Sequence, residues 1–440
     1  MRTRTTGGST PPVRAGRRSA AALAFGLTVA LLGGPGHTQS RGAQQTPGGT
    51  LPGATLESVL GVARQLSPEL AARALDADAA RARVRIAGSL PDPTVRVMSD
   101  EMPRSSGPRE NMMIYSFEQE IPLWGRRDLR RQAARAEVSQ MTAQAQAADA
   151  ELVEKVKVAF ARYYAAHQAA RRAADQRQAL QGVAQVARER YAQGRGEQTE
   201  VFRAEVEATR VSAEILRLEA SLRSAQGQLN ALLNRSPDAS LAAPERLRPL
   251  PDARALDVAH LIERARASSP SLAADAAAVG GAETNRVLTE RNWYPDVTLG
   301  ASAIDRGSYG PTGYQAWIGM KVPLQWGLRE AQQREAGAQA GAARARYEAR
   351  EQQIRGDLAD AAAGAEGSRR TVELIRRRLL PQAEALVRSG TAGYAVGRVD
   401  LGTVLRAQAD LVGFRLQLLS AEFDGQRQVA AIERLVGGDL

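Results

Sequence analysis

Hydrophobic positions along the chain follow two periods, one typical of long helices and one typical of short strands. Two segments carry apolar residues that step alternately by three and four positions, which is an a/d seam and predicts packed helices. We expect each seam to pack against the antiparallel neighbour within its own chain rather than against a partner. The seams are Val211, Ile215, Leu218, Leu222, Ala225, Leu229 and Leu232, and Val404, Ala407, Leu411, Phe414, Leu418 and Ala421.

Four short segments alternate apolar and polar residues and are predicted to be strands with one apolar and one mostly polar face. They span about 93–100, 112–121, 296–304 and 314–322. Each run approaches the 9 to 11 residues that cross a bilayer as a tilted strand. The alternative is a soluble sheet packed against the helices.

Landmark residues recur at an offset close to 202, which indicates an internal duplication. Residues 55–235 are predicted to form the first copy and 254–437 the second, with a proline-rich linker at 236–253. The matched residues are Pro68 and Pro270, Pro93 and Pro295, Tyr191 and Tyr394, Gly194 and Gly397, and Arg195 and Arg398.

Each copy is expected to follow one plan. A helix of about 35 residues (near 55–89 and 256–291) precedes the two strands, and a very long helix (about 126–190 and 328–390) follows them. A glycine-containing break then leads into a returning helix. Helices of that length span roughly 95 Å, which favours pipes, spacers and coiled coils. Pro381 predicts a kink or interruption of the second long helix.

The N-terminal segment has the layout of a cleavable secretory signal. Five arginines precede an apolar run from Ala20 to Leu32, which is too short for a spanning helix. We therefore interpret residues 1–40 as a signal peptide and 41–54 as a flexible segment. A disordered basic tail is the alternative, and Arg17-Arg18 alone is a weak twin-arginine signal.

Composition narrows the chemistry. The chain has no cysteine, which excludes disulfides and thiolate metal sites, and it has only three histidines. No nucleophile elbow, phosphate loop or HExxH motif is present, so we expect no enzyme, no cofactor and no metal site. Five of the net charges of +11 lie in residues 1–40, and the remaining 11 − 5 = +6 is spread along helices without an aromatic-studded basic patch. Nucleic acid is therefore not an expected partner. One cluster is compatible with soft metals, although facing lipid or packing in a loop is the commoner role. It comprises Met98, Met102, Met112 and Met113.

Four strands cannot close a barrel, because about eight are the practical minimum, and an open sheet cannot sit in lipid with unpaired edges. If the strands are transmembrane, the chain must therefore oligomerise. Arithmetic alone permits two, three or four chains.

The segment from Tyr394 to Leu411, YAVGRVDLGTVLRAQADL, resembles the Y-x-x-G-x-x-x-x-x-x-V-L-x-A-Q-x-x-L signature of the TolC-like outer-membrane efflux proteins. The resemblance covers essentially 55–437. It implies a mainly α fold with a small β part. Long antiparallel helical hairpins would form an α-barrel, and each chain would contribute four strands to a trimeric, twelve-stranded transmembrane β-barrel. The implied partners are two sister chains, outer-membrane lipid, a periplasmic adaptor (membrane fusion) protein and an inner-membrane pump of the resistance-nodulation-division type.

The resemblance places the turns at Gly194 and Gly397 at a periplasmic tip, where an adaptor docks and the pore narrows. Relatives commonly carry an acid six residues after the tip glycine, a position held here by Glu200 and Thr403, so the acidic ring is incomplete. Glycine itself is suited to the left-handed conformation that ends a helix. Charged residues near these turns are candidates for adaptor contacts or for holding the pore closed. They are Arg195, Glu197, Glu200, Arg398 and Asp400.

A second set of candidates lies where each strand pair leads into its long helix. The tryptophans there suit either an interfacial aromatic girdle or ordinary packing. The junction residues are Pro122, Trp124 and Gly125 in the first copy and Pro323, Trp326 and Gly327 in the second.

The resemblance, together with these features, implies the outer-membrane channel of a tripartite efflux system, a passive conduit with a long periplasmic extension. The alternative is a periplasmic coiled-coil adaptor or structural spacer without a pore. The sequence names neither the cargo nor the particular adaptor and pump.

Overall fold

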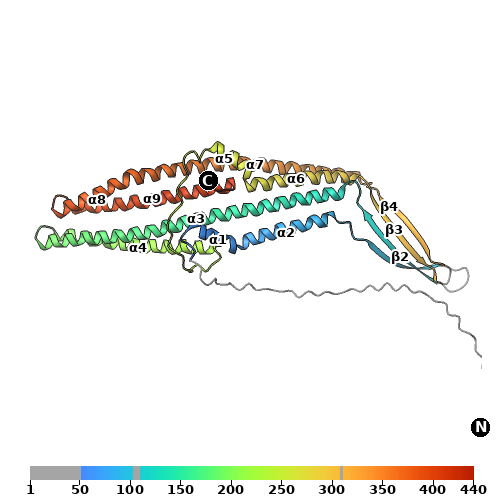
Figure 1. The fold of residues 1–440 in the computed structure, drawn as a ribbon, viewed down its shortest axis with the longest axis horizontal. Coiled ribbons are helices and arrows are strands. Elements are labelled where there is room, and N and C mark those ends of the chain that lie inside the picture. The colour runs from blue at the N-terminus through green and yellow to red at the C-terminus, as the bar shows by residue number, and fades with distance from the viewer. Residues whose placement is uncertain (1–50, 103–109, 308–310) are drawn as a thin grey trace, which may run out of the picture. The chain divides into compact units, whose positions relative to one another are not determined.

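The computed structural model repeats one order of elements twice (Figure 1). It describes residues 51–102, 110–307 and 311–440. The first copy comprises α1 Leu56–Leu66, α2 Pro68–Gly88, β1 Thr94–Met102, β2 Glu110–Ile121, α3 Arg126–Ala192 and α4 Gln198–Leu232. The second comprises α5 Val258–Ser268, α6 Pro270–Glu290, η1 Arg291–Trp293, β3 Asp296–Asp305, β4 Gly313–Lys321, α7 Trp326–Leu374, η3 Ile375–Leu379, α8 Leu380–Ala395 and α9 Leu401–Val436. The predicted two-fold repeat and fold class are confirmed.

The first helical segment of each copy is broken, so the prediction of one helix of about 35 residues was wrong. Ser67 ends α1 and caps α2, because its side chain accepts the backbone N–H of Leu70 at 3.3 Å. Pro68 then takes the first helical position, where its missing N–H costs nothing. Ser269 and Pro270 separate α5 from α6 at the matching position, although the Ser269 side chain makes no capping hydrogen bond and its hydroxyl lies 3.1 Å from that of Ser271. These Ser-Pro pairs combine a favoured N-cap residue with a favoured first residue, so they start a new helix.

The long helices form as expected, with one interruption. α3 has 67 residues and therefore spans about 100 Å. In the second copy a single π-helical stretch, Ile375–Leu379, separates α7 from α8, and Pro381 lies just after it. Proline lacks the N–H that continues the α-helical ladder, so the predicted interruption at this point is confirmed.

The two helical hairpins lie side by side (Figure 1), and α3 packs against α4, α2, α6 and α9. α9 in turn packs against α7 and α8. Alanines make up much of the buried surface of α3, which lets neighbouring backbones approach closely. Both predicted seams face inward. Their fully or nearly fully buried members are Val211, Ile215, Ala225 and Leu229 in α4, and Val404, Ala407, Leu411 and Ala421 in α9.

The strands form one antiparallel sheet in the order β1-β2-β3-β4, at the end of the long helices opposite their turns (Figure 1). Thr94 pairs with Glu118, Glu118 with Gly300, and Gly300 with Trp317. This row fixes the register of all four strands, so residues of one parity share a face.

Within residues 51–102, 110–307 and 311–440, the helices lack any stretch with the length and apolar character needed to cross a membrane. The predicted signal peptide at 1–40 lies outside the residues that the structure describes. Residues 103–109, between β1 and β2, and 308–310, between β3 and β4, also lie outside the described residues.

Candidate functional site

One face of the sheet is apolar and open. In register, the side chains of Val95, Tyr115, Leu299 and Ile318 fall on this side, and each is between 41% and 76% exposed. Large apolar groups that remain open over four adjacent strands require a cover other than this chain. We call this set the apolar sheet face. Its apolar members are Val95, Val97, Met113, Tyr115, Phe117, Ile121, Val297, Leu299, Ala301, Ala303, Tyr314, Ala316, Ile318 and Met320. The polar residues Ser99, Gln119 and Asp305 lie on the same face.

The opposite face is mostly polar and carries both signs of charge, with carboxylates in the majority. We call it the polar sheet face. Its members on the four strands include Arg96, Asp100, Ser116, Glu118, Glu120, Asp296, Thr298, Ser302, Gln315, Trp317 and Lys321. A sheet with one apolar and one hydrated face fits a wall between lipid and water.

β1 and β4 are the edge strands, and each pairs on one side only among the described residues. An open edge presents unpaired N–H and C=O groups, which are costly in lipid. The sheet therefore needs further strands at both edges if its apolar face meets lipid.

The sheet joins α3 through a constrained turn. Trp124 (φ 63°) and Gly125 (φ 71°) are both left-handed, a conformation that a tryptophan adopts only under constraint. The indole Nε1 of Trp124 donates to the carbonyl of Pro295 at 2.9 Å, and its ring lies 5.1 Å from that of Tyr294. Immediately after the turn, Arg126 donates to Asp296 at 2.7 and 2.6 Å. The first strand pair is thus tied to the second at the junction.

The second junction is built differently. Trp326 is the first residue of α7 and is 67% exposed, while Gly327 lies inside the helix. Pro122 is buried and Pro323 is half-buried. The one-residue insertion in Pro-Leu-Gln-Trp-Gly shifts the tryptophan past the turn, so the two predicted junctions are not equivalent. Neither Trp124 nor Trp326 is packed in the core of this chain.

The turns opposite the sheet are closed by glycine, as expected. Gly194 (φ 68°) and Gly397 (φ 78°) are left-handed, and each follows the end of its helix by two residues. Only glycine adopts this conformation without a Cβ penalty.

Beside the turns, three side chains from both hairpins meet. Tyr394 is 1% exposed, and its hydroxyl donates to Oε2 of Glu200 at 3.1 Å. The guanidinium of Arg190 lies 4.6 Å from the centre of the Tyr394 ring and donates to the Tyr394 carbonyl. Burial and, to a lesser extent, the Glu200 carboxylate raise the pKa of Tyr394 to about 12. We call Arg190, Glu200 and Tyr394 the tip cluster.

The other predicted tip residues lie around this cluster. Glu197 and Arg398 are exposed on the turns, and Arg195, also exposed, uses its carbonyl to accept from Arg190 at 3.1 Å. Asp400 caps α9, because its carboxylate accepts the N–H of Thr403 at 3.0 Å. The Thr403 hydroxyl and N–H lower the pKa of Asp400.

Sequence reasoning missed Arg190 as a site residue, and it used Tyr394 only as part of a signature. The tyrosine pattern was visible at Tyr191 and Tyr394, but no sequence signal distinguishes their environments. Tyr191 is 48% exposed.

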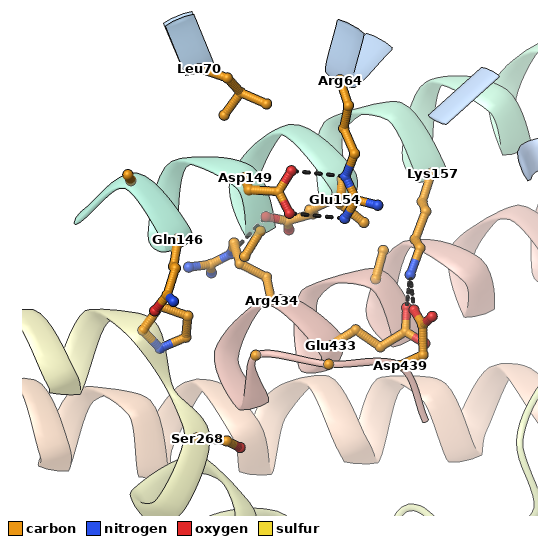
Figure 2. A pocket seen from close by; sticks show the side chains of 17 residues that line it. Arg64, Leu70, Gln146, Asp149, Glu154, Lys157, Ser268, Glu433, Arg434 and Asp439 are labelled. Carbon is orange, nitrogen blue, oxygen red and sulfur yellow. Dashed lines mark hydrogen bonds and ion pairs between the residues drawn. The ribbon is translucent and has the colours of Figure 1, made fainter. Parts of the chain in front are cut away.

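Another cluster, near the C-terminal end of α9, links the two copies (Figure 2). Lys157 of α3 donates to Glu433 at 2.8 Å and to Asp439 at 2.5 Å, and Lys157 and Glu433 are 8% and 3% exposed. Arg248 of the linker also pairs with Glu433, at 2.6 Å. The Lys157 ammonium lowers the pKa of Asp439. This network joins both copies and the linker, and it borders an open cavity of about 700 Å³.

The methionines of the predicted cluster are divided between the two faces of the sheet. In register, Met98 and Met112 lie on the polar sheet face and Met113 on the apolar one. Their thioethers therefore point to opposite sides of the sheet. The Met102 side chain lies outside the part of the chain that the structure describes.

A sheet with one lipid-compatible face, extended by paired helical hairpins, defines the class of outer-membrane channel proteins. The outer membrane efflux protein family model matches residues 59–235 and 261–438. The chain belongs to this family, whose members are channel and transport proteins rather than enzymes. The two matched segments coincide with the two copies of the repeat.

Individual relatives agree with this assignment. The chain is 25% identical over 388 residues to the cobalt-zinc-cadmium resistance protein CzcC of Cupriavidus metallidurans, covering 87% of this chain and 90% of that protein. Its fold matches the outer-membrane protein VceC of Vibrio cholerae with a TM-score of 0.72 at 22% identity, over 87% of this chain and 96% of that one. It also matches the outer-membrane channel OprN with a TM-score of 0.73 at 20% identity, over 87% and 90%.

Proposed function

We propose that this efflux-family chain is a passive trimeric conduit through the outer membrane, serving a tripartite system with a periplasmic adaptor and an inner-membrane pump. The observation that carries the proposal is the apolar sheet face, open across all four strands. No element within residues 51–102, 110–307 and 311–440 covers it. Lipid is the cover that matches a tall apolar band backed by a polar, water-filled side.

The sheet edges support oligomerisation. Closing a barrel takes about eight strands, and one chain brings four. Pairing β4 of one copy with β1 of the next satisfies both open edges in the same step. Three copies close a twelve-stranded barrel, an even number as in bacterial outer-membrane proteins.

The helices support the same ring. Phe202, Val206 and Leu216 form an exposed stripe on α4, with exposures of 55%, 68% and 67%. We call these residues the α4 stripe. At the repeat offset of 203 residues, Phe202 corresponds to Leu405 of α9, which packs against the core between the hairpins. The covered surface of α9 meets α3 of the same chain, so the α4 stripe fits the second copy's long helix in a neighbouring chain.

The tip cluster is proposed to hold the helical end of the conduit closed. It joins the two hairpins through one hydroxyl, one carboxylate and one guanidinium that lie close to the turns. The exposed residues Arg195, Glu197 and Arg398 remain proposed adaptor contacts. Charges at an exposed turn guide a partner's approach more than they add affinity.

The relative CzcC suggests which cargo to test, because its name describes it as a cobalt-zinc-cadmium resistance protein. Divalent metal cations are therefore the first cargo to test. Deleting the gene in its host and comparing growth inhibition by these ions with inhibition by organic drugs separates the two cargo classes. The parent strain, which keeps the gene, provides the protein for testing export and cleavage of residues 1–40.

The decisive test is reconstitution. In fractionated cells, the mature protein should sediment with outer-membrane vesicles. After purification it should run as a heat-modifiable oligomer and give steady conductance in planar bilayers. The competing role, a periplasmic adaptor or spacer, predicts a soluble chain that is released by osmotic shock and gives no conductance. That result would refute the conduit.

A further inference from the structure

The polar sheet face carries a single aromatic side chain among the described strand residues, and it occupies an unusual place. Trp317 of β4 pairs with Gly300 of β3, and Glu118 of β2 flanks the same glycine on its other side. A Cβ built on Gly300 would lie 2.1 Å from the indole Cε2 and Cζ2 atoms. The indole therefore fills the space that a side chain at position 300 would take.

Glycine weakens a strand, because it lacks a side chain to pack and loses more conformational freedom on folding. Its φ is not in the left-handed region, so the backbone does not require it. The close approach of Trp317 is what requires a residue without a Cβ at this position. With glycine there, the ring lies against the wall of the sheet.

The neighbours of Trp317 on the same face are much smaller. Gln315 and Gly319 flank it along β4, and Thr298 and Ser302 flank Gly300 along β3. Trp317 is consequently the bulkiest group on this stretch of the polar face. In a symmetric ring, its copies lie at one level of the lumen.

We propose that Trp317 limits the bore of the strand section and that Gly300 keeps the indole folded back against the wall. This inference rests on the proposed function, in which the polar face lines the lumen. Pore diameter and lining groups decide which solutes pass. A side chain at position 300 would push the indole away from the wall and narrow the passage.

A purely structural role for the pair is the competing explanation, since an aromatic ring over a strand glycine also stabilises a sheet. Both explanations predict that Gly300→Ala strains the sheet. Only the proposal that Trp317 limits the bore predicts that larger solutes pass when the indole is removed. The readout must therefore measure passage in assembled protein.

The chain has no cysteine, so one introduced thiol reports passage without background. Lys321 is exposed, and it lies on the same face as Trp317, at the helix end of β4. A reagent that enters from the loop end of the sheet must pass the Trp317 level to reach Lys321→Cys. Labelling intact cells with a small maleimide and with a polymer-linked maleimide separates access from size exclusion, whatever the state of the tip.

In the Lys321→Cys background, Trp317→Ala should raise the rate of polymer-maleimide labelling about threefold relative to the small maleimide. Gly300→Ala should lower this ratio, and Gly300→Ala with Trp317→Ala should restore it. Tyr314→Ala removes an aromatic ring from the apolar face of the same strand and should leave it unchanged. Rates are normalised to the amount of heat-modifiable oligomer.

An unchanged ratio in Trp317→Ala overturns the inference. If Gly300→Ala fails to assemble, Trp317→Phe takes its place and should give a ratio between wild type and Trp317→Ala; a ratio equal to wild type again overturns the inference. Failure of the small maleimide to reach Cys at 321 from outside, in assembled protein with Trp317 intact, would instead contradict the proposed conduit.

Discussion

The two copies of the repeat place equivalent residues in different surroundings. Tyr394 of the second copy is buried against the first hairpin, whereas its counterpart Tyr191 is 48% exposed. Phe202 on α4 is likewise open, while its counterpart Leu405 packs between the hairpins. In the second copy, this surface is thus covered by the first copy. The corresponding surface of the first copy, which includes Phe202, is exposed. In the proposed trimer, this free surface is where a sister chain would bind.

The copies also end differently. Asn230 near the end of α4 is fully buried and donates to the carbonyls of Pro237 and Ala239 in the linker. Its counterpart at the offset of 203 is Glu433, which binds Lys157 of the other copy and Arg248 of the linker. In the first copy, the buried polar group at this position is hydrogen-bonded by the adjacent linker. In the second copy, it forms an ion pair with the first copy.

The largest effect is expected from a charged substitution in the exposed α4 stripe of the first copy. Phe202→Asp places a charge in the α4 stripe, where the proposed ring buries it without a partner. We expect loss of the heat-modifiable oligomer, with helix content retained. Gel mobility with and without heating, together with circular dichroism, measures both. Arg210→Gln changes an exposed position of the same helix and should leave the oligomer intact.

Next in size is the anchor between copies. Lys157→Met leaves Glu433 buried with only Arg248 as its charged partner, which should destabilise the fold by about 3 kcal/mol. Denaturant unfolding in detergent measures this. Adding Glu433→Gln should recover part of the loss. Asn230→Ala, the matched change in the first copy, should cost about 1–2 kcal/mol, and an equal or larger cost there would contradict the comparison.

Removing a tyrosine hydroxyl near the tip should change channel opening in the second copy only. Tyr394→Phe removes the hydroxyl that binds Glu200, and a loss of about 1.4 kcal/mol corresponds to about a tenfold higher open probability. Single-channel recording of both variants tests this. Tyr191→Phe should behave as wild type. Equal effects of the two changes would rule out a tip cluster specific to the second copy.

The smallest effect is confined to alkaline pH. The pKa of Tyr394 is raised to about 12, so the protonated phenol stabilises the folded state below the ordinary tyrosine pKa of about 10. That contribution is lost as pH rises through about 12. Wild type should therefore lose more unfolding free energy than Tyr394→Phe between about pH 9 and pH 11. Parallel losses would show that the Tyr394 proton does not contribute.

The sequence predicted the features that recur with a period and missed those that depend on one partner. The seams ending at Leu232 and Ala421, and the strands that pair Gly300 with Trp317, follow from spacing alone. The Ser67 cap was present as a Ser-Pro pair but was interpreted as part of a continuous helix. Tyr394 contacts Glu200, 194 residues earlier in the chain, and Glu433 contacts Lys157, 276 residues earlier. No local pattern encodes such contacts.

The central claim is that the free surfaces of the first copy and of the sheet edges are covered by sister chains. Native mass spectrometry of the mature protein, released from detergent, counts those chains directly. We expect a species of three chains in the wild type, and Phe202→Asp should convert it to single chains. A wild-type protein that remains a single chain at every concentration would contradict it.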